Sequence, residues 1–369
     1  MKKTLNVDLG ARSYDIIIAP QLIKNSKIYL DPIIAGRRVA VISDKIVSKK
    51  YINLLSPTLD SITDKWDLFL IEPGEGAKSF SCVEDLLDRM LSEGIDRQCA
   101  VIAFGGGVVG DVAGFAAGLI MRGIDLIQIP TTLMSQVDSS VGGKNGINTR
   151  QGKNLVGSFL QPRIVLNDVT LLRTLPSDEM KSGYGEILKY GLLSGEEEFK
   201  WIENNCSAIF SFNNSALVEV IRMGCKTKAG IVSEDELDRG KRALVNLGHT
   251  FAHAFEAYAG FGEFQHGLSV GLGLIAACDL SERMKFCDNG VSERVRKHAN
   301  ETGMPVKLSD LSSEIIWKKD ELYKRMLHDK KTVNGKINFV LLREIGNPFV
   351  CNEVNQESVF KTLINLGAV

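Results

Sequence analysis

Three of the five histidines in the chain lie close together in the sequence, at His249, His253 and His266. A neutral imidazole is a common protein ligand for zinc, and its charge changes near neutral pH. His249 and His253 are four residues apart, so on a helix they share one face, and a turn would bring His266 to the same point. A polar stripe on an ordinary helix would have the same spacing, so these residues alone leave a metal site open.

Glu186 and Lys189 are three residues apart in a predicted helix, so they also share one face. An exposed ion pair would explain them equally well. The glycines that flank Glu186 and the apolar residues around it favour a packed face, on which a carboxylate and an ammonium group could do chemistry.

A glycine-rich segment, Gly105–Gly110, follows a strand pattern over 100–104 and precedes a helical pattern over 112–119. Glycines allow backbone amides to approach a pyrophosphate, and the N-terminus of the following helix favours negative charge. The acid that usually binds the ribose lies about 20 residues later, which would be Asp125. Asp125 instead precedes another strand at 126–130. Because at least three strands also precede the motif, a standard N-terminal Rossmann unit is not expected.

Asp44 ends a buried apolar strand over 38–44. An acid at the carboxyl end of a parallel strand can bind a ribose hydroxyl, or it can cap the next helix. The turn after residue 72 carries Glu75 and Lys78. The remaining elements predicted in this half are strands over 13–19, 68–73 and 164–168 and a helix over 81–92.

The segment from Pro130 to Ser158 is polar and rich in glycine, and it is predicted to be a long loop. Long loops within compact domains are usually functional. Its charged and amide groups suit an anionic, hydroxylated ligand. A solvated surface loop is the alternative.

The composition is that of an ordinary soluble enzyme of 369 residues, with 44% hydrophobic and 24% charged residues. This length favours two domains. A net charge of −1 provides no field that would attract nucleic acid or an anionic membrane. Seven scattered cysteines suggest reduced thiols and a cytoplasmic location. No apolar run reaches the roughly 18 residues of a membrane span, and the N-terminus lacks a signal peptide core.

The C-terminal half has helical spacing from Ser177 to about residue 330. Three of its predicted helices cover 216–232, 243–260 and 267–283, and a short strand is predicted at 336–342. His298 and His328 are predicted to lie on the surface.

The motifs of the chain, taken in order, resemble those of the 3-dehydroquinate synthase family of sugar-phosphate cyclases between about residues 40 and 346. They are Pro-Gly-Glu-x-x-Lys, Gly-Gly-Gly-Val-Val-Gly-Asp, Met-Arg-Gly-Ile-Asp, Ile-Pro-Thr-Thr-Leu, Gln-Val-Asp-Ser-Ser-Val-Gly-Gly-Lys, Gly-Lys-Asn-Leu, Glu-x-x-Lys-Tyr-Gly, Asn-x-Gly-His-Thr-x-x-His-Ala and Asp-Lys-Lys. One departure is Leu268, where many members of the family carry glutamate.

The resemblance implies an α/β NAD-binding domain over 1–176, Rossmann-like but non-standard, and an all-α domain over 177–369, with the active site between them. It implies a homodimer. It also implies that Glu186, His249 and His266 bind zinc, or cobalt in its place, and that His253 contacts the substrate instead of the metal.

The resemblance assigns further roles residue by residue. NAD would be bound by Asp44, Glu75, Lys78, Gly106, Gly107, Asp111, Thr131, Thr132, Lys144, Lys153 and the segment from Leu171 to Thr174. Catalysis would involve Asp138, Lys144, Lys189, Lys228, Arg242, Asn246 and His253. The phosphate end of the substrate would be bound by Lys153, Asn154, Lys331 and an Arg122 that reaches across the dimer interface.

The reaction implied by the resemblance converts 3-deoxy-D-arabino-heptulosonate 7-phosphate to 3-dehydroquinate and phosphate in the shikimate route. It proceeds by transient oxidation by NAD, elimination of phosphate, re-reduction, ring opening and an internal aldol closure. Three alternatives are another sugar-phosphate cyclase, a metal-dependent polyol dehydrogenase that consumes NAD, and a non-enzymatic NAD-binding module. The many basic groups disfavour the dehydrogenase, and the histidines and Glu186 disfavour a module without activity.

Overall fold

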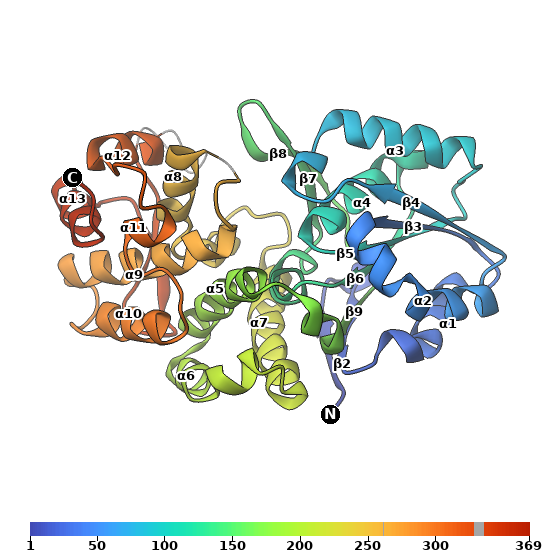
Figure 1. Cartoon of the computed structure of the whole chain (residues 1–369), viewed down its shortest axis with the longest axis horizontal. Helices are drawn as coiled ribbons and strands as arrows, with labels where there is room; N and C mark the ends of the chain where they lie inside the picture. The colour runs from blue at the N-terminus through green and yellow to red at the C-terminus, as the bar shows by residue number, and fades with distance from the viewer. Residues whose placement is uncertain (261, 328–335) are drawn as a thin grey trace. The chain divides into compact units, whose positions relative to one another are not determined.

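The computed structural model of the chain describes residues 1–260, 262–327 and 336–369. The chain forms two compact units (Figure 1), one of Met1–Leu175 with Phe212–Leu237 and one of Pro176–Ser211 with Asp238–Val369. The predicted second domain, 177–369, includes helix α7 (Asn214–Glu234). This helix packs on strands of the first unit, because its buried face meets β1 and β2.

The first unit is built on a seven-stranded sheet in the order β1-β2-β9-β6-β5-β3-β4. All neighbouring pairs are parallel except β1 and β2. The strands are β1 (Lys3–Val7), β2 (Tyr14–Ala19), β3 (Arg38–Asp44), β4 (Lys65–Ile71), β5 (Ala100–Gly105), β6 (Asp125–Pro130) and β9 (Ile164–Asp168). The predicted strand at 38–44 is confirmed at both ends. Its centre, residues 39–42, is apolar without interruption, which is the pattern of a strand buried on both faces.

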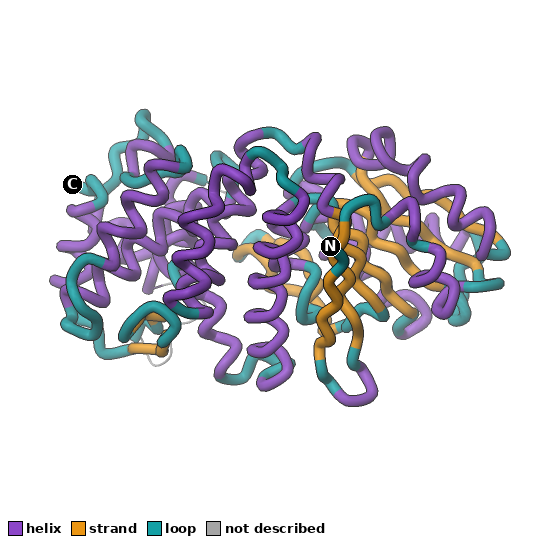
Figure 2. Tube along the Cα trace, turned by 90° about the horizontal axis from the view of Figure 1, so that it is seen from below, coloured by secondary structure: helices purple, strands orange, loops and turns teal. Residues whose placement is uncertain are grey.

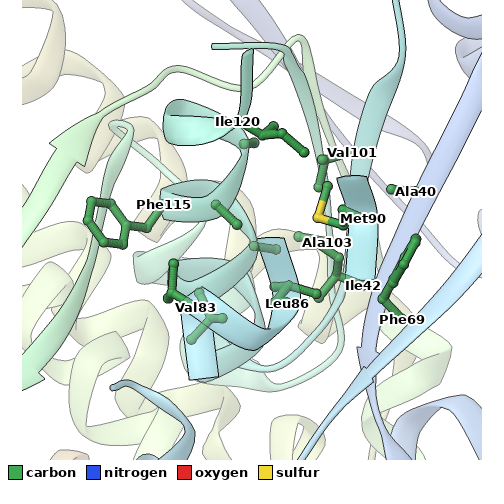
Figure 3. Close-up of a cluster of buried hydrophobic side chains, with 14 of the residues drawn as sticks. Ala40, Ile42, Phe69, Val83, Leu86, Met90, Val101, Ala103, Phe115 and Ile120 are labelled. Carbon is green, nitrogen blue, oxygen red and sulfur yellow. The ribbon is translucent and has the colours of Figure 1, made fainter. Parts of the chain in front are cut away.

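Helices cover both faces of this sheet and create two separate cores. Alternate residues of β3 point to opposite faces, so Val39 and Val41 pack with one pair of helices, and Ala40 and Ile42 pack with the other. The first pair is α1 (Lys27–Ile34) and α2 (Lys45–Ile62), and the second is α3 (Phe80–Ser92) and α4 (Gly107–Leu119). Figure 3 shows the second core, in which Leu86 and Met90 lie beside Ile42 and Ala103.

The segment predicted to be a long loop is largely structured, so that prediction was wrong. It contains a π-helical turn, η5 (Ser135–Ser139), and an antiparallel hairpin of β7 (Lys144–Thr149) and β8 (Gly152–Phe159). The hairpin lacks alternating apolar residues. Glycines at paired positions, such as Gly146 opposite Gly157, instead let its two backbones approach closely. A Cβ atom on Gly157 would lie 2.1 Å from the carbonyl oxygen of Asn145.

The second unit is mainly helical, and Figure 2 draws most of it in purple. Its helices are α5 (Ser177–Ser194), α6 (Glu196–Phe210), α8 (His249–Ala259), α9 (His266–Arg283), α10 (Val291–Glu301), α11 (Leu308–Leu311), α12 (Lys319–Leu327) and α13 (Gln356–Asn365). A hairpin of β10 (Phe339–Leu342) and β11 (Pro348–Cys351) confirms the short predicted strand, so the unit is not all-α. Helix α9 lies at its centre and packs on α5, α8, α10 and α13.

Two predictions about exposure have different outcomes. His298 is buried, with 3% of its surface exposed, and its Nε2 lies 2.8 Å from the Tyr184 hydroxyl. Its predicted place on the surface was therefore wrong, because one turn of α10 faces α5 in a way that local sequence does not reveal. His328 lies outside the described residues. None of the described helices combines the length and apolarity that a membrane crossing requires.

Candidate metal centre and nucleotide site

The second unit brings together Glu186, His249 and His266, although they come from three different helices. One ligand atom from each lies within 4.8 Å of the others. Nε2 of His249 and Nε2 of His266 are each 3.7 Å from Oε1 of Glu186. Glu186 is 1% exposed. The group therefore has the composition and proximity of the three protein ligands that a catalytic zinc site requires.

A glycine determines where His249 begins its helix. The predicted helix over 243–260 is interrupted at Gly248, which has a φ of 79° and follows the 3₁₀ helix η7 (Lys241–Asn246). A Cβ atom on Gly248 would lie 2.8 Å from the backbone nitrogen of Leu274 in α9. Only glycine combines this conformation with this contact, so α8 restarts at His249 beside α9.

The hydrogen bonds of the two imidazoles are compatible with a bound metal. Nδ1 of His249 lies 3.2 Å from the carbonyl oxygen of Leu247, and Nδ1 of His266 lies 2.6 Å from Oε1 of Glu256. Both oxygens are acceptors, so each Nδ1 donates, and in the neutral ring each Nε2, which lies 3.7 Å from Glu186, has a lone pair for a metal. Neutral histidines held by partners in this way are typical metal ligands.

Lys189 is buried beside the triad, so the alternative of an exposed ion pair does not apply. Its Nζ lies 2.5 Å from Oε2 of Glu186 and 4.4 Å from the ring centre of Tyr190. Only 1% of Lys189 is exposed. A lysine beside the carboxylate can hold charge, or a proton, next to a bound substrate.

The other predicted site residues of this unit are placed on or next to α8. The ring centre of His253 lies 5.6 Å from that of His249 and 6.0 Å from that of His266. Arg242 and Asn246 belong to η7, which packs on α5 and leads into α8, and Arg242 is 1% exposed. Lys331 lies outside the described residues.

The first unit has a topological switch between β3 and β5. After β3 the chain adds β4 on one side, and it then returns to add β5 on the other. Ligands of open α/β sheets bind at such a switch, outside the carboxyl ends of the strands. Asp44 ends β3 and Gly105 ends β5, so the two predicted nucleotide segments meet there.

Asp44 caps the next helix, which was one of the two roles considered for it. Its Oδ1 accepts hydrogen bonds of 2.7 and 2.8 Å from the amides of Ile46 and Val47 in α2. Asp125 is at the opposite end of its strand and pairs with Arg37 at 2.7 Å. The structure therefore places Asp125 away from the nucleotide segments, as its sequence position indicated.

The glycine-rich segment is tightly packed where it enters α4. Gly106 is the N-cap of α4 and Gly107 is its first residue. A Cβ atom on Gly106 would lie 3.1 Å from Cγ2 of Thr132. The amide of Thr131 donates to the carbonyl oxygen of Gly105 at 2.9 Å. The ends of β5 and β6 are thus joined, and the α4 N-terminus is unobstructed by a side chain at residue 106.

Lys78, Asp111 and Asn154 form a polar cluster near this segment. Nζ of Lys78 donates to Oδ2 of Asp111 and to Oδ1 of Asn154, each at 2.5 Å. Burial lowers the pKa of Lys78, but the carboxylates of Asp111 and Glu75 outweigh it, so the pKa lies above its usual value. Glu75 in turn accepts a 2.8 Å hydrogen bond from Asn148.

A second polar pair, Asp138 with Lys228, joins η5 to α7. Nζ of Lys228 lies 2.6 Å from Oδ1 of Asp138 and donates to its carbonyl oxygen at 2.8 Å. Lys228 is 7% exposed. Helix α7 thus carries a residue of the C-terminal half into the first unit.

The remaining predicted residues of the first unit lie in the β7–β8 hairpin, in the 3₁₀ helix η6 (Val169–Thr174) and in the turn at Arg122. Lys144 begins β7, and Lys153 lies in β8. The hydroxyl of Tyr51 donates to the carbonyl oxygen of Leu171 at 3.0 Å and hydrogen-bonds the Thr174 hydroxyl. Arg122 is exposed and has a φ of 66°.

The seven-stranded α/β unit and the helical unit with a Glu-His-His group together have the architecture of an enzyme that uses NAD and a metal ion. Models of the N-terminal and C-terminal parts of 3-dehydroquinate synthase match residues 68–182 and 183–332. The chain belongs to the 3-dehydroquinate synthase family.

Individual relatives agree with this assignment. The 3-dehydroquinate synthase of Rhodospirillum rubrum is 44% identical over 360 residues, which cover 97% of this chain and 94% of the relative. The crystal structure of 2-deoxy-scyllo-inosose synthase complexed with carbaglucose-6-phosphate, NAD⁺ and Co²⁺ aligns with a TM-score of 0.86 at 25% identity, over 98% of this chain and 99% of that one. The structure of 2-epi-5-epi-valiolone synthase from Streptomyces hygroscopicus, with NAD⁺ and Zn²⁺ bound, aligns with a TM-score of 0.86 at 27% identity, over 96% of each chain.

Proposed function

We propose that the chain catalyses the reaction of its family, the conversion of 3-deoxy-D-arabino-heptulosonate 7-phosphate to 3-dehydroquinate and phosphate. The observation that carries the proposal is the group of Glu186, His249 and His266, of which Glu186 and His249 are buried, in a chain of this family. The rival dehydrogenase is not favoured, because relatives 44% identical over nearly the whole chain are synthases. The two solved cyclases contain NAD with cobalt or zinc, so the cofactors proposed here are NAD and zinc, with cobalt as a substitute.

Each group of residues has a physical role in the proposal. Bound NAD would accept a hydride from the substrate and return it, and the metal ion would polarise substrate oxygens. Glu186, His249 and His266 would hold the metal. Lys189, at 2.5 Å from Glu186, would supply a fixed cationic donor beside the bound oxygens. His253 would contact the substrate on the exposed side of the triad.

The other predicted site residues would orient the substrate. They are Arg242 and Asn246 of the helical unit, and Lys144 and the Asp138–Lys228 pair of the first unit. The buried guanidinium of Arg242 offers a planar donor that suits a carboxylate. Asn246 already donates to the carbonyl oxygen of Ala243 at 3.1 Å, which fixes its amide. Lys144 and Lys228 would add positive charge, and Asp138 would keep Lys228 in place.

The nucleotide would bind at the carboxyl ends of β3 and β5. The backbone at Gly106 and Gly107 and the N-terminus of α4 suit a pyrophosphate. Asp44, Glu75, Lys78 and Asp111 offer the polar groups for the rest of the nucleotide. Thr131, Thr132, Lys144, Lys153, Leu171 and Thr174 complete the proposed contacts.

The phosphate of the substrate would be held by Lys153, Asn154 and Lys331, together with Arg122 of a second copy in a homodimer. Arg122 lies between two residues with positive φ, Met121 at 51° and Gly123 at 112°, in an exposed turn. Such a turn costs free energy unless surrounding contacts maintain it, and a partner subunit would supply such contacts.

The seven free cysteines support a cytoplasmic location.

The test is a turnover assay with NAD at much less than the substrate concentration. A synthase returns its hydride within each turnover. Phosphate should therefore accumulate to many equivalents per NAD, while the absorbance of NADH shows no net rise during turnover. His249→Ala is the matched inactive control, and a hexose 6-phosphate is the control substrate for other cyclases. NADH that accumulates in proportion to product would contradict the proposal and identify a dehydrogenase.

A further inference from the structure

Glu256 contacts a proposed metal ligand without being one itself. It lies two turns after His249 on α8, and only 2% of its surface is exposed. Its Oε1 is 2.6 Å from Nδ1 of His266, the first residue of α9. We propose that Glu256 is a positioning residue that orients His266 for metal binding. The inference rests on the proposed function, because it needs the metal site.

The position of Glu256 on α8 explains how the contact forms. His249, His253 and Glu256 are separated by four and three residues, so they lie along one face of the helix. That face meets the start of α9, because α8 and α9 pack together. The spacing of Glu256 from the two histidines is therefore a signal that the sequence itself carries.

The two proposed histidine ligands are held differently. The side chain of His249 is 10% exposed, and its partner is a neutral backbone carbonyl oxygen at 3.2 Å. The side chain of His266 is 30% exposed, so it is packed less tightly, and its partner is a carboxylate at 2.6 Å. The shorter bond to a charged acceptor is the stronger one. Glu256 thus supplies to His266 the orientation that packing supplies to His249.

The carboxylate also determines what His266 can offer a metal. An ionised carboxylate only accepts hydrogen bonds, so Nδ1 of His266 must donate and Nε2 keeps its lone pair. That lone pair is directed to the region of Glu186, 3.7 Å away. A carboxylate partner also makes the imidazole a better electron donor, and loss of such a partner typically lowers metal affinity by about 10- to 100-fold.

Packing of α8 on α9 does not depend on Glu256. A Cβ atom on Gly273 would lie 2.2 Å from the carbonyl oxygen of Gly248, so the two backbones touch at the start of α8. Substitution of Glu256 should therefore leave the helices in place. Loss of metal affinity in a Glu256 variant that keeps its fold would therefore indicate a positioning role and not a purely structural one.

The experiment measures zinc affinity of the full-length protein by competition with a chromogenic chelator. Glu256→Gln keeps shape and an acceptor oxygen but removes the charge, and it should weaken zinc binding about tenfold. Glu256→Ala also removes the acceptor and should weaken zinc binding toward 100-fold. The visible spectrum of the cobalt-loaded protein should change in Glu256→Ala. The matched control is Asp279→Asn, which replaces another buried carboxylate, on α9, that pairs with Arg283 at 2.6 Å.

The outcomes separate this inference from the proposed function. Graded loss in the Glu256 variants with wild-type affinity in Asp279→Asn supports it. Wild-type affinity and an unchanged cobalt spectrum in the Glu256 variants overturn it, as does an equal loss in Asp279→Asn. If Glu256→Ala does not fold, Glu256→Gln alone decides. His249→Ala is measured in parallel. If it loses zinc while Glu256 variants keep zinc, this inference alone fails, whereas wild-type zinc affinity in His249→Ala means that both fail.

Discussion

Gly185 and Gly267 bring two ligand-bearing helices into direct backbone contact. A Cβ atom on Gly185 of α5 would lie 2.1 Å from the carbonyl oxygen of Gly267 on α9, and a Cβ atom on Gly267 would lie 1.8 Å from that of Ser182. Each glycine is next to a proposed ligand, Glu186 or His266. The separation of these two ligands is therefore determined by the absence of two side chains.

Gly185→Ala should move the two helices apart and disturb the metal site. Inserting a methyl group into a filled contact costs about 1–3 kcal/mol of unfolding free energy, and bound zinc should fall below one equivalent. The matched control is Gly230→Ala on α7, where a Cβ atom would meet nothing within 4 Å. That variant should gain about 0.5–1 kcal/mol. Full zinc occupancy and normal stability in Gly185→Ala would show that the contact does not matter.

Substitution of the triad should separate metal binding from turnover. Glu186→Ala and His249→Ala should lose both zinc and activity, because each removes one of three ligands. His253→Ala should keep nearly one equivalent of zinc and lose mainly turnover. Elemental analysis of the purified variants measures this. A zinc-free His253→Ala protein would show that the ligand set is wrong.

Gly106→Val should weaken NAD binding without loss of zinc. A Cβ atom at this position already lies 3.1 Å from Thr132, and a branched side chain would also occupy the approach to the α4 N-terminus. Calorimetric titration with NAD measures the affinity, and elemental analysis provides the control for zinc. Unchanged NAD affinity would place the nucleotide elsewhere.

The buried His298 should make the protein less stable at acidic pH. Burial lowers its pKa, and the positive charge of Arg294 lowers it further, while Glu203 and Glu301 raise it by less than burial lowers it. The unfolded state then binds a proton near pH 6.5, whereas the folded state does so only at lower pH. The stability that this residue contributes is therefore complete above about pH 6.5 and is lost as pH falls through the range below it.

His298→Gln removes this titration but retains a polar partner for Tyr184, which hydrogen-bonds the histidine at 2.8 Å. Urea unfolding of both proteins at pH 7.5 and pH 5.5, with a chelator present, measures the effect. The wild type should lose more unfolding free energy between the two pH values than the variant does. Parallel pH profiles would exclude a role for His298.

The sequence by itself determined the features that depend on neighbouring residues. The mainly apolar run over 38–44 has the pattern of a buried strand, and the glycine-rich segment 105–110 leads from the end of one strand into the first turn of a helix. The ordered motifs were also sufficient to indicate the family, because they record the chemistry of a site without specifying its geometry. Local chemistry and local conformation are both carried by adjacent residues.

Tertiary structure decided which distant residues meet. The hairpin of β7 and β8 has no alternation of apolar and polar residues that would predict it. Its strands pair where glycines allow close backbone approach. The burial of His298 and the hydrogen bond from His266 to Glu256 depend on which helix faces which. Helix α7 likewise joins the first unit through contacts with β1 and β2. Such contacts join residues far apart in the chain, so no local pattern specifies them.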